Sequence, residues 1–489
     1  MSSTLVEQDM QAGRTDSLPV FPLPLSDFEY YMHVDDRPSH PMVFVMVVTV
    51  AGTLQRSDFQ QSIDAAISAN PLFRSHIRTL PGKGACWVLS QQTTWPVEWQ
   101  TIQSTHGQYS AAAEEFDELL PIRAIDLTRE CGIQILVQQS ELKSRVVFYL
   151  HHACCDGLGG LQFIGEVFAF YSRRTTPDGG RSADFQLPDP KQLRLRERFE
   201  CGAAGAERQK RSLRKSLAKA ARLIFRKPVP IQAPPQTRSN QAGSSGSGSN
   251  TNAPVAIRTR VIPRSVFRAL RATANGAGVS VNDLCIREMM LLIRDWNKKF
   301  GGIRNNDWIR VAVPISMRSA EHDRMPATNL VSYAFITRRV SECSDPEALA
   351  KSIHEQTGDV LYNREGIVFL KCIRVLRKLP GALRLLLGLK SCFCTVVLAN
   401  VGDIRRRFSG RFPLESGQWV AGDVVVEDIW GVAPVRPNTR AAVTIGEYGG
   451  QMTVHLRTDG TVMTSADSEA FLAELVTRLT GLAETSDAH

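Results

Sequence analysis

Several features are missing from the chain, and each absence excludes a class of protein. No run of about 18 uncharged apolar residues occurs in the 489 residues, so we expect no transmembrane helix. The ten cysteines show no Cys-x-x-Cys spacing, which favours reduced thiols over disulfides or a zinc site. Neither a Gly-x-Ser-x-Gly elbow nor a Gly-Lys-Ser/Thr loop is present, which argues against a hydrolase or a nucleotide triphosphatase of those types.

Acidic and aromatic residues are scarce in three particular stretches. Residues 191–227 hold thirteen Lys/Arg and three Glu, a balance of +10 in a chain whose net charge is +9. Residues 366–390 contain no acid, and residues 228–254 contain no aromatic residue and one charge. Helical spacing with a basic face over 204–225 indicates either a membrane-surface helix or a solvated helix packed on its own domain, and both interpretations stay open.

The length of the chain predicts two domains of roughly 200 residues each. The Gly/Ser-rich composition of 228–254 is typical of a flexible linker, which gives the clearest boundary. We therefore expect five segments: a disordered tail (1–18), a first half (19–190), a basic amphipathic helix (191–227), the linker (228–254) and a second half (255–489).

The stretch that carries chemistry is a strand that ends in two histidines. Residues 146–150 are β-branched or aromatic, and His151 and His152 follow them. Asp156 and Gly157 come next, before an apolar segment with helical spacing, so the pattern predicts a strand, a tight loop and a helix. A neutral imidazole at a strand end can take a proton from an alcohol, amine or thiol.

Successive strand residues point to opposite faces, so only one of the two histidines can face a substrate. We assign the general base to His152 and a structural role to His151. The same alternation disfavours a metal site built from both histidines and Asp156. Cys154 and Cys155 could be acyl-accepting nucleophiles, but small buried fillers are the simpler interpretation.

The spacing His151-His152-x-x-x-Asp156-Gly157 resembles the HHxxxDG motif of acyltransferases that use coenzyme A or carrier-protein thioesters. That superfamily includes chloramphenicol acetyltransferase, peptide-synthetase condensation domains and bacterial wax ester synthase/diacylglycerol acyltransferases. Other segments resemble wax ester synthase-like motifs in the same order. They are Pro71-Leu72-Phe73, Asn282-Asp283, Pro314-x-Ser316-x-Arg318, Asn329-x-Val331-Ser332 and Asn400-x-Gly402. Phe73, Thr328 and Ala399 depart from the residues usual in those motifs.

The resemblance implies an α/β fold of two chloramphenicol-acetyltransferase-like subdomains. Mixed sheets with flanking helices would form a V-shaped pseudo-dimer with a central tunnel. It implies a catalytic centre of His152, Asp156 and Gly157, supported by His151 and Arg318, with Asp156 and Arg318 in a buried bidentate ion pair. The tunnel would be lined by Pro71, Leu72, Phe73, Asn282, Asp283, Asn329, Thr395, Asn400 and Gly402, and Asn400 or a nearby N–H would stabilise an oxyanion.

The implied activity is transfer of an acyl group from a thioester to an alcohol. Long-chain acyl-CoA would be the co-substrate, a fatty alcohol or diacylglycerol the acceptor, and no bound cofactor or metal is expected. A standalone condensation-type transferase using carrier-protein thioesters and a non-catalytic lipid-binding relative remain alternatives. We expect a cytoplasmic protein that binds no nucleic acid, and residues 204–225 and 366–390 are candidates for peripheral contact with a membrane or lipid droplet. For 366–390, a buried helix pair whose cations extend to solvent is the alternative interpretation.

Overall fold

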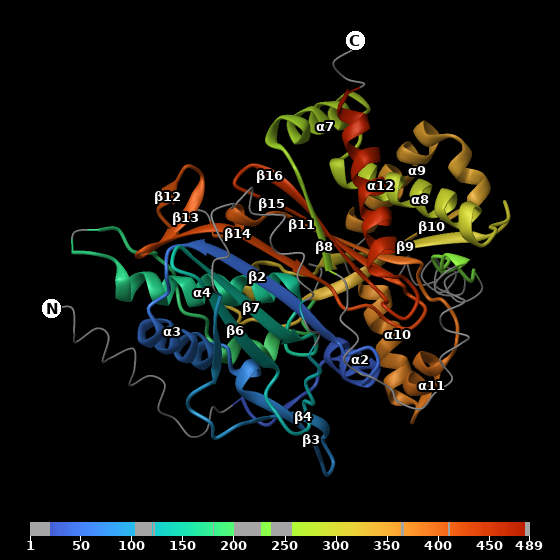
Figure 1. Cartoon of the computed structure of the whole chain (residues 1–489). Helices are drawn as coiled ribbons and strands as arrows, with labels where there is room; N and C mark the ends of the chain where they lie inside the picture. The colour runs from blue at the N-terminus through green and yellow to red at the C-terminus, as the bar shows by residue number, and fades with distance from the viewer. Residues whose placement is uncertain are drawn as a thin grey trace.

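A computed structural model of the chain describes residues 20–102, 120, 123–178, 180–199, 226–235, 257–362, 366–408 and 411–484 (Figure 1). Most of it is built on two mixed sheets with helices packed against them. The predicted α/β architecture of two sheet-based subdomains is confirmed. No helix within the described ranges is long and apolar enough to cross a membrane.

The larger sheet holds the histidine strand at its centre. Its order is β12-β13-β14-β2-β7-β6-β5, and only β5 and β6 pair in parallel. The strands are β2 (Val43–Ala51), β5 (Val97–Thr101), β6 (Ile133–Gln139), β7 (Lys143–His151), β12 (Leu414–Glu415), β13 (Gln418–Ala421) and β14 (Val424–Val432). Helices α3 (Arg56–Ala69) and α4 (Gly157–Thr175) pack on each other, and every residue of β2 except the last is buried, on both faces of the strand.

A three-stranded sheet and a short helix complete the first half. The sheet has the order β1-β4-β3, with β1 (Leu23–Pro24), β3 (Ser75–Leu80) and β4 (Gly84–Leu89). Helix α2 (Asp27–Asp35) follows β1, and Ser26 and Glu29 form the predicted capping box at its start. Two 3-10 helices are η1 (Pro71–Arg74) and η2 (Pro190–Leu195).

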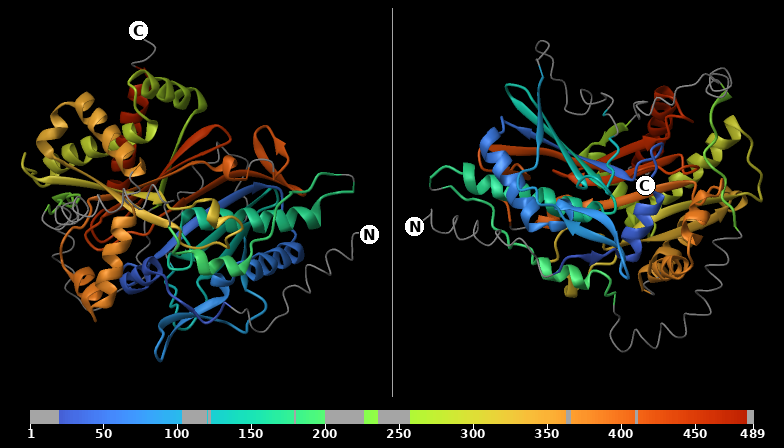
Figure 2. Two further views of the ribbon diagram at one scale, coloured as in Figure 1. Left: turned by 180° about the vertical axis from the view of Figure 1, so that it is seen from behind. Right: turned by 90° about the horizontal axis from the view of Figure 1, so that it is seen from below.

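The second sheet has six strands in the order β10-β9-β11-β15-β16-β8. They are β8 (Ile257–Ile262), β9 (Trp308–Ser316), β10 (Val331–Arg339), β11 (Val396–Asp403), β15 (Ala441–Tyr448) and β16 (Gln451–Thr458). Its helices are α7 (Arg264–Gly276), α8 (Val281–Phe300), α9 (Pro346–Tyr362), α10 (Gly366–Lys378), α11 (Ala382–Gly388) and α12 (Ser465–Glu484), with 3-10 helices η3 (Ala320–His322), η4 (Val340–Ser344) and η5 (Ile404–Phe408). Helices α7, α8 and α12 pack together beside this sheet, as Figure 2 shows from two further sides.

One part of the expected second half belongs to the first sheet. Strand β14 pairs antiparallel with β2, from Val425 opposite Ala51 to Val432 opposite Val45. The chain leaves the second sheet after β11 and returns to it as β15. The boundary that assigns 255–489 to one half is therefore wrong for residues 414–432, because strand pairing across the molecule leaves no local mark in the sequence.

The segments expected to be a basic helix and a linker also need correction where they are described. Arg196 of the expected basic helix is buried and follows the 3-10 helix η2. At the start of the expected linker, the Val229 N–H donates to the Trp308 carbonyl at 2.9 Å and Ile231 is fully buried. Any linker must therefore begin after residue 235. The expected helix over 204–225 and the tail over 1–18 lie outside the described residues.

Candidate active site

Strand β7 ends at the two histidines, which differ in their surroundings. His151 is the last residue of β7 and is fully buried. Its Nδ1 accepts a hydrogen bond from the Ala153 N–H at 3.1 Å, and its Nε2 lies 3.6 Å from the Asp36 carboxylate. Through this accepted bond the His151 ring helps to hold the loop backbone.

His152 follows β7 and lies between two aromatic rings. The ring centroids of Phe44 and Phe28 are 5.2 and 6.0 Å from that of His152, whose residue exposure is 9%. Burial lowers the pKa of His152, and it outweighs the opposing effects of its own carbonyl group, of Asp156 and of Asn329. His152 is therefore neutral at pH 7 and able to accept a proton.

Both carboxylate oxygens of Asp156 accept hydrogen bonds. Arg318 donates to both carboxylate oxygens, at 2.8 and 2.9 Å, and the N–H groups of Gly159 and Leu330 donate at 2.7 and 2.8 Å. Burial alone would raise the pKa of Asp156, but the Arg318 charge and these donors lower it. The predicted ion pair is present, with its Asp156 end buried and Arg318 partly exposed. A carboxylate so fully bonded braces the loop and is not free to take a proton.

Residues 328–330, which precede β10 in the second half of the chain, hold the histidine loop by hydrogen bonds. The Asn329 side-chain amide donates to the carbonyls of His152 and Ala153, at 2.9 and 2.8 Å. The next residue, Leu330, supplies one of the N–H donors to Asp156. Asn329, which was predicted as a tunnel residue, thus holds the backbone beneath the candidate base.

Two glycines after Asp156 have different roles. A Cβ built on Gly157 would meet no atom within 4 Å, so packing does not require glycine there. A Cβ on Gly159 would lie 2.9 Å from the Thr328 carbonyl oxygen. Gly159, which sequence reasoning did not single out, therefore allows helix α4 to approach residues 328–330.

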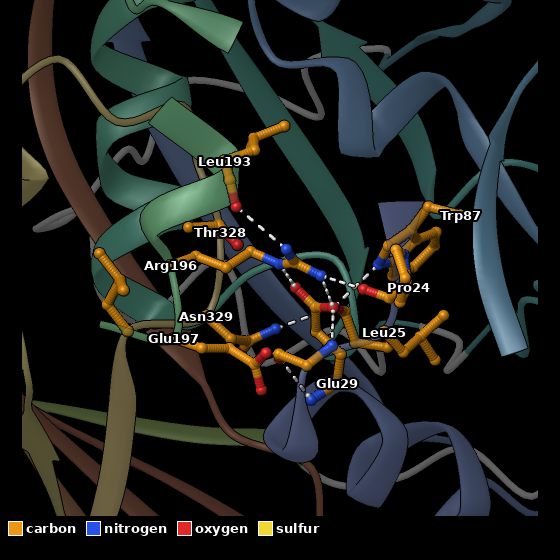
Figure 3. Close-up of polar contacts among 12 residues, drawn as sticks. Pro24, Leu25, Glu29, Trp87, Leu193, Arg196, Glu197, Thr328 and Asn329 are labelled. Atoms are coloured by element: carbon orange, nitrogen blue, oxygen red, sulfur yellow. Dashed lines mark hydrogen bonds and ion pairs between the residues drawn. The ribbon is translucent and has the colours of Figure 1, made fainter. Parts of the chain in front are cut away.

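A buried ion pair that the sequence did not reveal lies beside residues 328–330. Figure 3 shows Glu29 and Arg196 pointing toward each other next to Thr328 and Asn329. The Glu29 and Arg196 side chains pair at 2.8 Å, and Trp87 Nε1 and the Ser26 N–H also donate to Glu29. The capping box was the available signal for Glu29, whereas Arg196 was hidden among thirteen basic residues of its segment.

The other residues predicted to line the tunnel lie on several different elements. Leu72 and Phe73 of η1 are fully buried, with Phe73 4.5 Å from Phe163 of α4 between ring centroids. Asp283 accepts from the N–H of Ser280, the N-cap of α8, in a capping box, and also from Thr357 and His354 of α9. Pro71 begins η1, Asn282 lies in the first turn of α8, Thr395 bonds to Val229 and Arg310, and Asn400 and Gly402 lie in the last part of β11.

Two cavities lie near the loop, although none of residues 151–157 lines either of them. The larger, about 660 Å³, lies between β10 and helices α9, α10 and α11. Tyr31 and Tyr333 line it, and each contacts Phe28, the ring beside His152. The smaller, about 210 Å³, is polar and includes Arg318 and the buried Glu166, whose pKa burial raises to about 7.

The alternatives of thiol and metal chemistry receive no support from the site. Cys154 and Cys155 are fully buried, and burial raises the pKa of both thiols far above its usual range. A thiol that does not ionise is a poor nucleophile. Within the ranges that the structure describes, no three His, Cys, Asp or Glu side chains are grouped so that they could hold a metal ion.

Solved structures with this fold are condensation domains and related proteins. The first condensation domain of the calcium-dependent antibiotic synthetase matches with a TM-score of 0.66 and 14% identity over 94% of this chain and 96% of that one. Polyketide synthase associated protein 5 from Mycobacterium tuberculosis matches with a TM-score of 0.58 and 15% identity over 94% and 98%. The starter condensation domain of rhizomide synthetase, in complex with C8-CoA, matches at 0.62 and 11% over 94% of each chain. The chain therefore has the condensation-domain fold, with two chloramphenicol-acetyltransferase-like subdomains.

Sequence comparison is less informative. No family model matches the chain. Two uncharacterized proteins of Mycobacterium tuberculosis, Rv2305 of strain H37Rv and MT2362 of strain CDC 1551, are 25% identical over 347 residues. The match covers 69% of this chain and 72% of each relative.

Proposed function

We propose that the chain is an acyltransferase that moves an acyl group from a thioester to a hydroxyl acceptor, with His152 as the general base. The observation that carries the proposal is a neutral histidine held at a strand end by a fully bonded carboxylate and by Asn329. The condensation-domain fold and the complex of one structural neighbour with C8-CoA support a thioester donor.

The chemistry follows from the position of His152. Its neutral imidazole removes the proton of the acceptor hydroxyl, and the oxygen attacks the thioester carbonyl carbon. The tetrahedral intermediate collapses with cleavage of the carbon–sulfur bond, and the imidazolium returns its proton to the leaving thiolate. Asp156 and Arg318 act as positioning residues, and Gly157, beside which an added Cβ meets nothing, leaves space next to the loop.

The larger cavity favours an apolar, long-chain substrate. Its lining on α10 and α11 is mostly aliphatic, whereas its other walls include charged residues such as Arg310, Arg338 and Glu355. Its volume of about 660 Å³ is within the range of about 300–1,000 Å³ common for ligand pockets. Long-chain acyl-CoA with a fatty alcohol or diacylglycerol is therefore our first choice. The central tunnel and the pseudo-dimer expected from the resemblance remain part of this proposal, as does an oxyanion contact from Asn400.

The test is acyl transfer from one radiolabelled long-chain acyl-CoA to a panel of alcohols. We expect His152→Ala to lower turnover by about 10²–10⁴-fold, the usual contribution of a general base. His76→Ala, which removes a histidine of β3, is the matched control and should leave turnover unchanged. Turnover retained by His152→Ala would overturn the assignment.

Two alternatives give different results in the same assay. If acyl-carrier protein supports turnover and acyl-CoA does not, the chain is a condensation-type transferase. A lipid-binding relative without activity would bind acyl-CoA and yield no product with any acceptor. The intact His152, Asp156 and Gly157 favour catalysis over this last alternative.

A further inference from the structure

Exposed apolar side chains are concentrated on one part of the molecule. Seven of the ten large apolar residues that are exposed in the described structure lie between residues 361 and 389. Five of them are on the two-helix hairpin α10–α11, and we call these five the hairpin patch: Val375, Leu379, Leu385, Leu386 and Leu389, with exposures of 38–73%. A cluster of this kind marks an interaction surface more often than scattered exposed leucines do.

The opposite side of the hairpin is anchored to the rest of the protein. Leu370, Ile373 and Leu383 are buried, and the Phe369 ring packs against Tyr31 at 5.8 Å between centroids. Further contacts come from arginines: Arg374 pairs with Asp27 at 2.6 Å, and Arg377 donates to the Leu25 carbonyl at 2.7 Å. In Figure 1 the hairpin lies next to α2. The hairpin is thus a fixed part of the fold, and the hairpin patch is its outer surface.

The charge of the hairpin is of one sign. Residues 366–390 contain six Lys/Arg and no Asp or Glu. Two of these cations, Arg374 and Arg377, are engaged by α2, whereas Lys371, Lys378, Arg384 and Lys390 are exposed and form no ion pair among the described residues. Exposed leucines interspersed with unpaired cations match an anionic lipid surface, which takes up apolar side chains and attracts Lys and Arg.

Two residues of the hairpin patch also line the larger cavity, whose exposed lining further includes Glu342, Glu355 and Asp359. Leu386 and Leu389 line that cavity and are at the same time 38% and 53% exposed. Leu376, Leu383 and Leu387 of the same hairpin line it as well and are less exposed. An apolar molecule leaving a bilayer at the hairpin would therefore remain in contact with leucines until it is within the cavity.

We propose that the α10–α11 hairpin docks on an anionic lipid surface and that the larger cavity receives its lipid substrate directly from that surface. The docking proposal rests only on the features of the hairpin. Delivery of the substrate rests on the proposed acyltransferase function.

The docking test is co-sedimentation of the full chain with vesicles of phosphatidylcholine containing about one-third phosphatidylglycerol. The variant Val375→Gln/Leu379→Gln/Leu385→Gln removes patch residues that do not line the cavity, and Gln preserves helix propensity. We expect it to bind at least about tenfold more weakly than the wild type. Leu142→Gln/Leu414→Gln, at positions that are 71% and 60% exposed outside the hairpin, is the control and should bind as the wild type does.

Charge is tested separately with Lys371→Gln/Lys378→Gln/Arg384→Gln/Lys390→Gln. This variant should lose its preference for anionic vesicles over pure phosphatidylcholine. Docking is overturned if the wild type does not sediment with anionic vesicles, or if the two hairpin variants bind as well as the control. It is also overturned if the patch variant instead abolishes a wild-type dimer or the binding of an acidic carrier protein, because the occupant is then a protein.

Delivery is tested by presenting the same long-chain alcohol in detergent micelles and in anionic vesicles. The patch variant should retain wild-type turnover with the micellar acceptor and lose at least about tenfold with the vesicle acceptor, because only the second route requires docking. An equal loss of turnover with the micellar and the vesicle acceptor would overturn the proposal that the cavity receives its substrate from the lipid surface. If vesicle binding is intact and neither presentation yields product, the acyltransferase proposal has failed and docking stands.

Discussion

The ends of strands β7 and β11 both match motifs of the same superfamily, yet the protein holds them in different ways. At the end of β7, Asp156 is buried and receives donors from Arg318, Gly159 and Leu330. At the end of β11, Asn400 is exposed, and its side-chain oxygen accepts from the Gly402 N–H two residues away, at 2.9 Å. A motif match therefore does not tell whether a side chain is braced by distant parts of the chain or only by its neighbours.

The difference has a direct physical consequence. The β7 loop can keep its geometry only if the two halves of the molecule stay together, because Arg318, Asn329 and Leu330 all come from the second half. The β11 end is held by pairing with β15, with a register shift between Asn400 and Gly402, whose φ is +67°, and among the described residues the Asn400 side chain bonds only within this end. Substitutions at the two ends should thus differ in both stability and activity.

The largest difference is expected for the acidic residues of the two ends. Asp156→Asn leaves Arg318 without its carboxylate and should lower the free energy of unfolding by about 2–4 kcal/mol. Asp403→Asn at the end of β11 removes ion pairs with Arg405 and the exposed Arg406, and should cost less than about 1 kcal/mol. Urea unfolding measures both, and equal effects would show that the Asp156 pair does not hold the halves together.

A smaller difference is expected for the two asparagines. Asn329→Ala leaves the carbonyls of His152 and Ala153 without their donor and should cost about 1–3 kcal/mol. Asn400→Ala at the exposed strand end should stay within about 0.5 kcal/mol of the wild type. If Asn329 is a positioning residue, its loss lowers kcat in the acyl transfer assay more than it raises KM. A change in stability alone would leave Asn329 a purely structural residue.

The glycines of the β7 loop test the close approach of its helix. Gly159→Ala forces a Cβ to 2.9 Å from the Thr328 carbonyl oxygen and should cost about 1–3 kcal/mol. Gly157→Ala meets no atom and should leave the melting temperature nearly unchanged. Lowered activity of Gly157→Ala with unchanged stability would locate the substrate beside this residue. Equal destabilisation by both would contradict the described packing.

The smallest effect is expected for the dependence of kcat/KM on pH near neutrality. Burial lowers the pKa of His152 below its ordinary 6.5, so the neutral base predominates from pH 6.5 upward. We expect kcat/KM to be level between pH 6.5 and 8 and to fall about tenfold per pH unit below the His152 pKa. An acid limb centred above pH 7 would assign the base to another group.

The sequence allowed the prediction of those features that local pattern and motif determine. Strand alternation separated His152 from His151, and the Pro-x-Ser-x-Arg segment identified Arg318 as the partner of Asp156. The capping box at Ser26 and Glu29 was likewise visible from spacing.

Features that depend on long-range packing were not predictable in this way. The pairing of β14 with β2, the burial of Arg196 against Glu29 and the approach of Gly159 to Thr328 each join segments far apart in the chain. The same holds for residues 226–235, whose Pro-rich composition is typical of a linker although Ile231 is fully buried. Composition describes the average behaviour of a segment, whereas burial depends on the partner that the fold provides.

The most direct measurement is a single-turnover comparison of the wild type and His152→Ala with a saturating long-chain acyl-CoA and one alcohol acceptor. With His152 as the base, the variant should bind acyl-CoA as tightly as the wild type in isothermal titration and form ester about 10²–10⁴-fold more slowly. Ester formation by the variant within about tenfold of the wild-type rate would contradict a general base at His152.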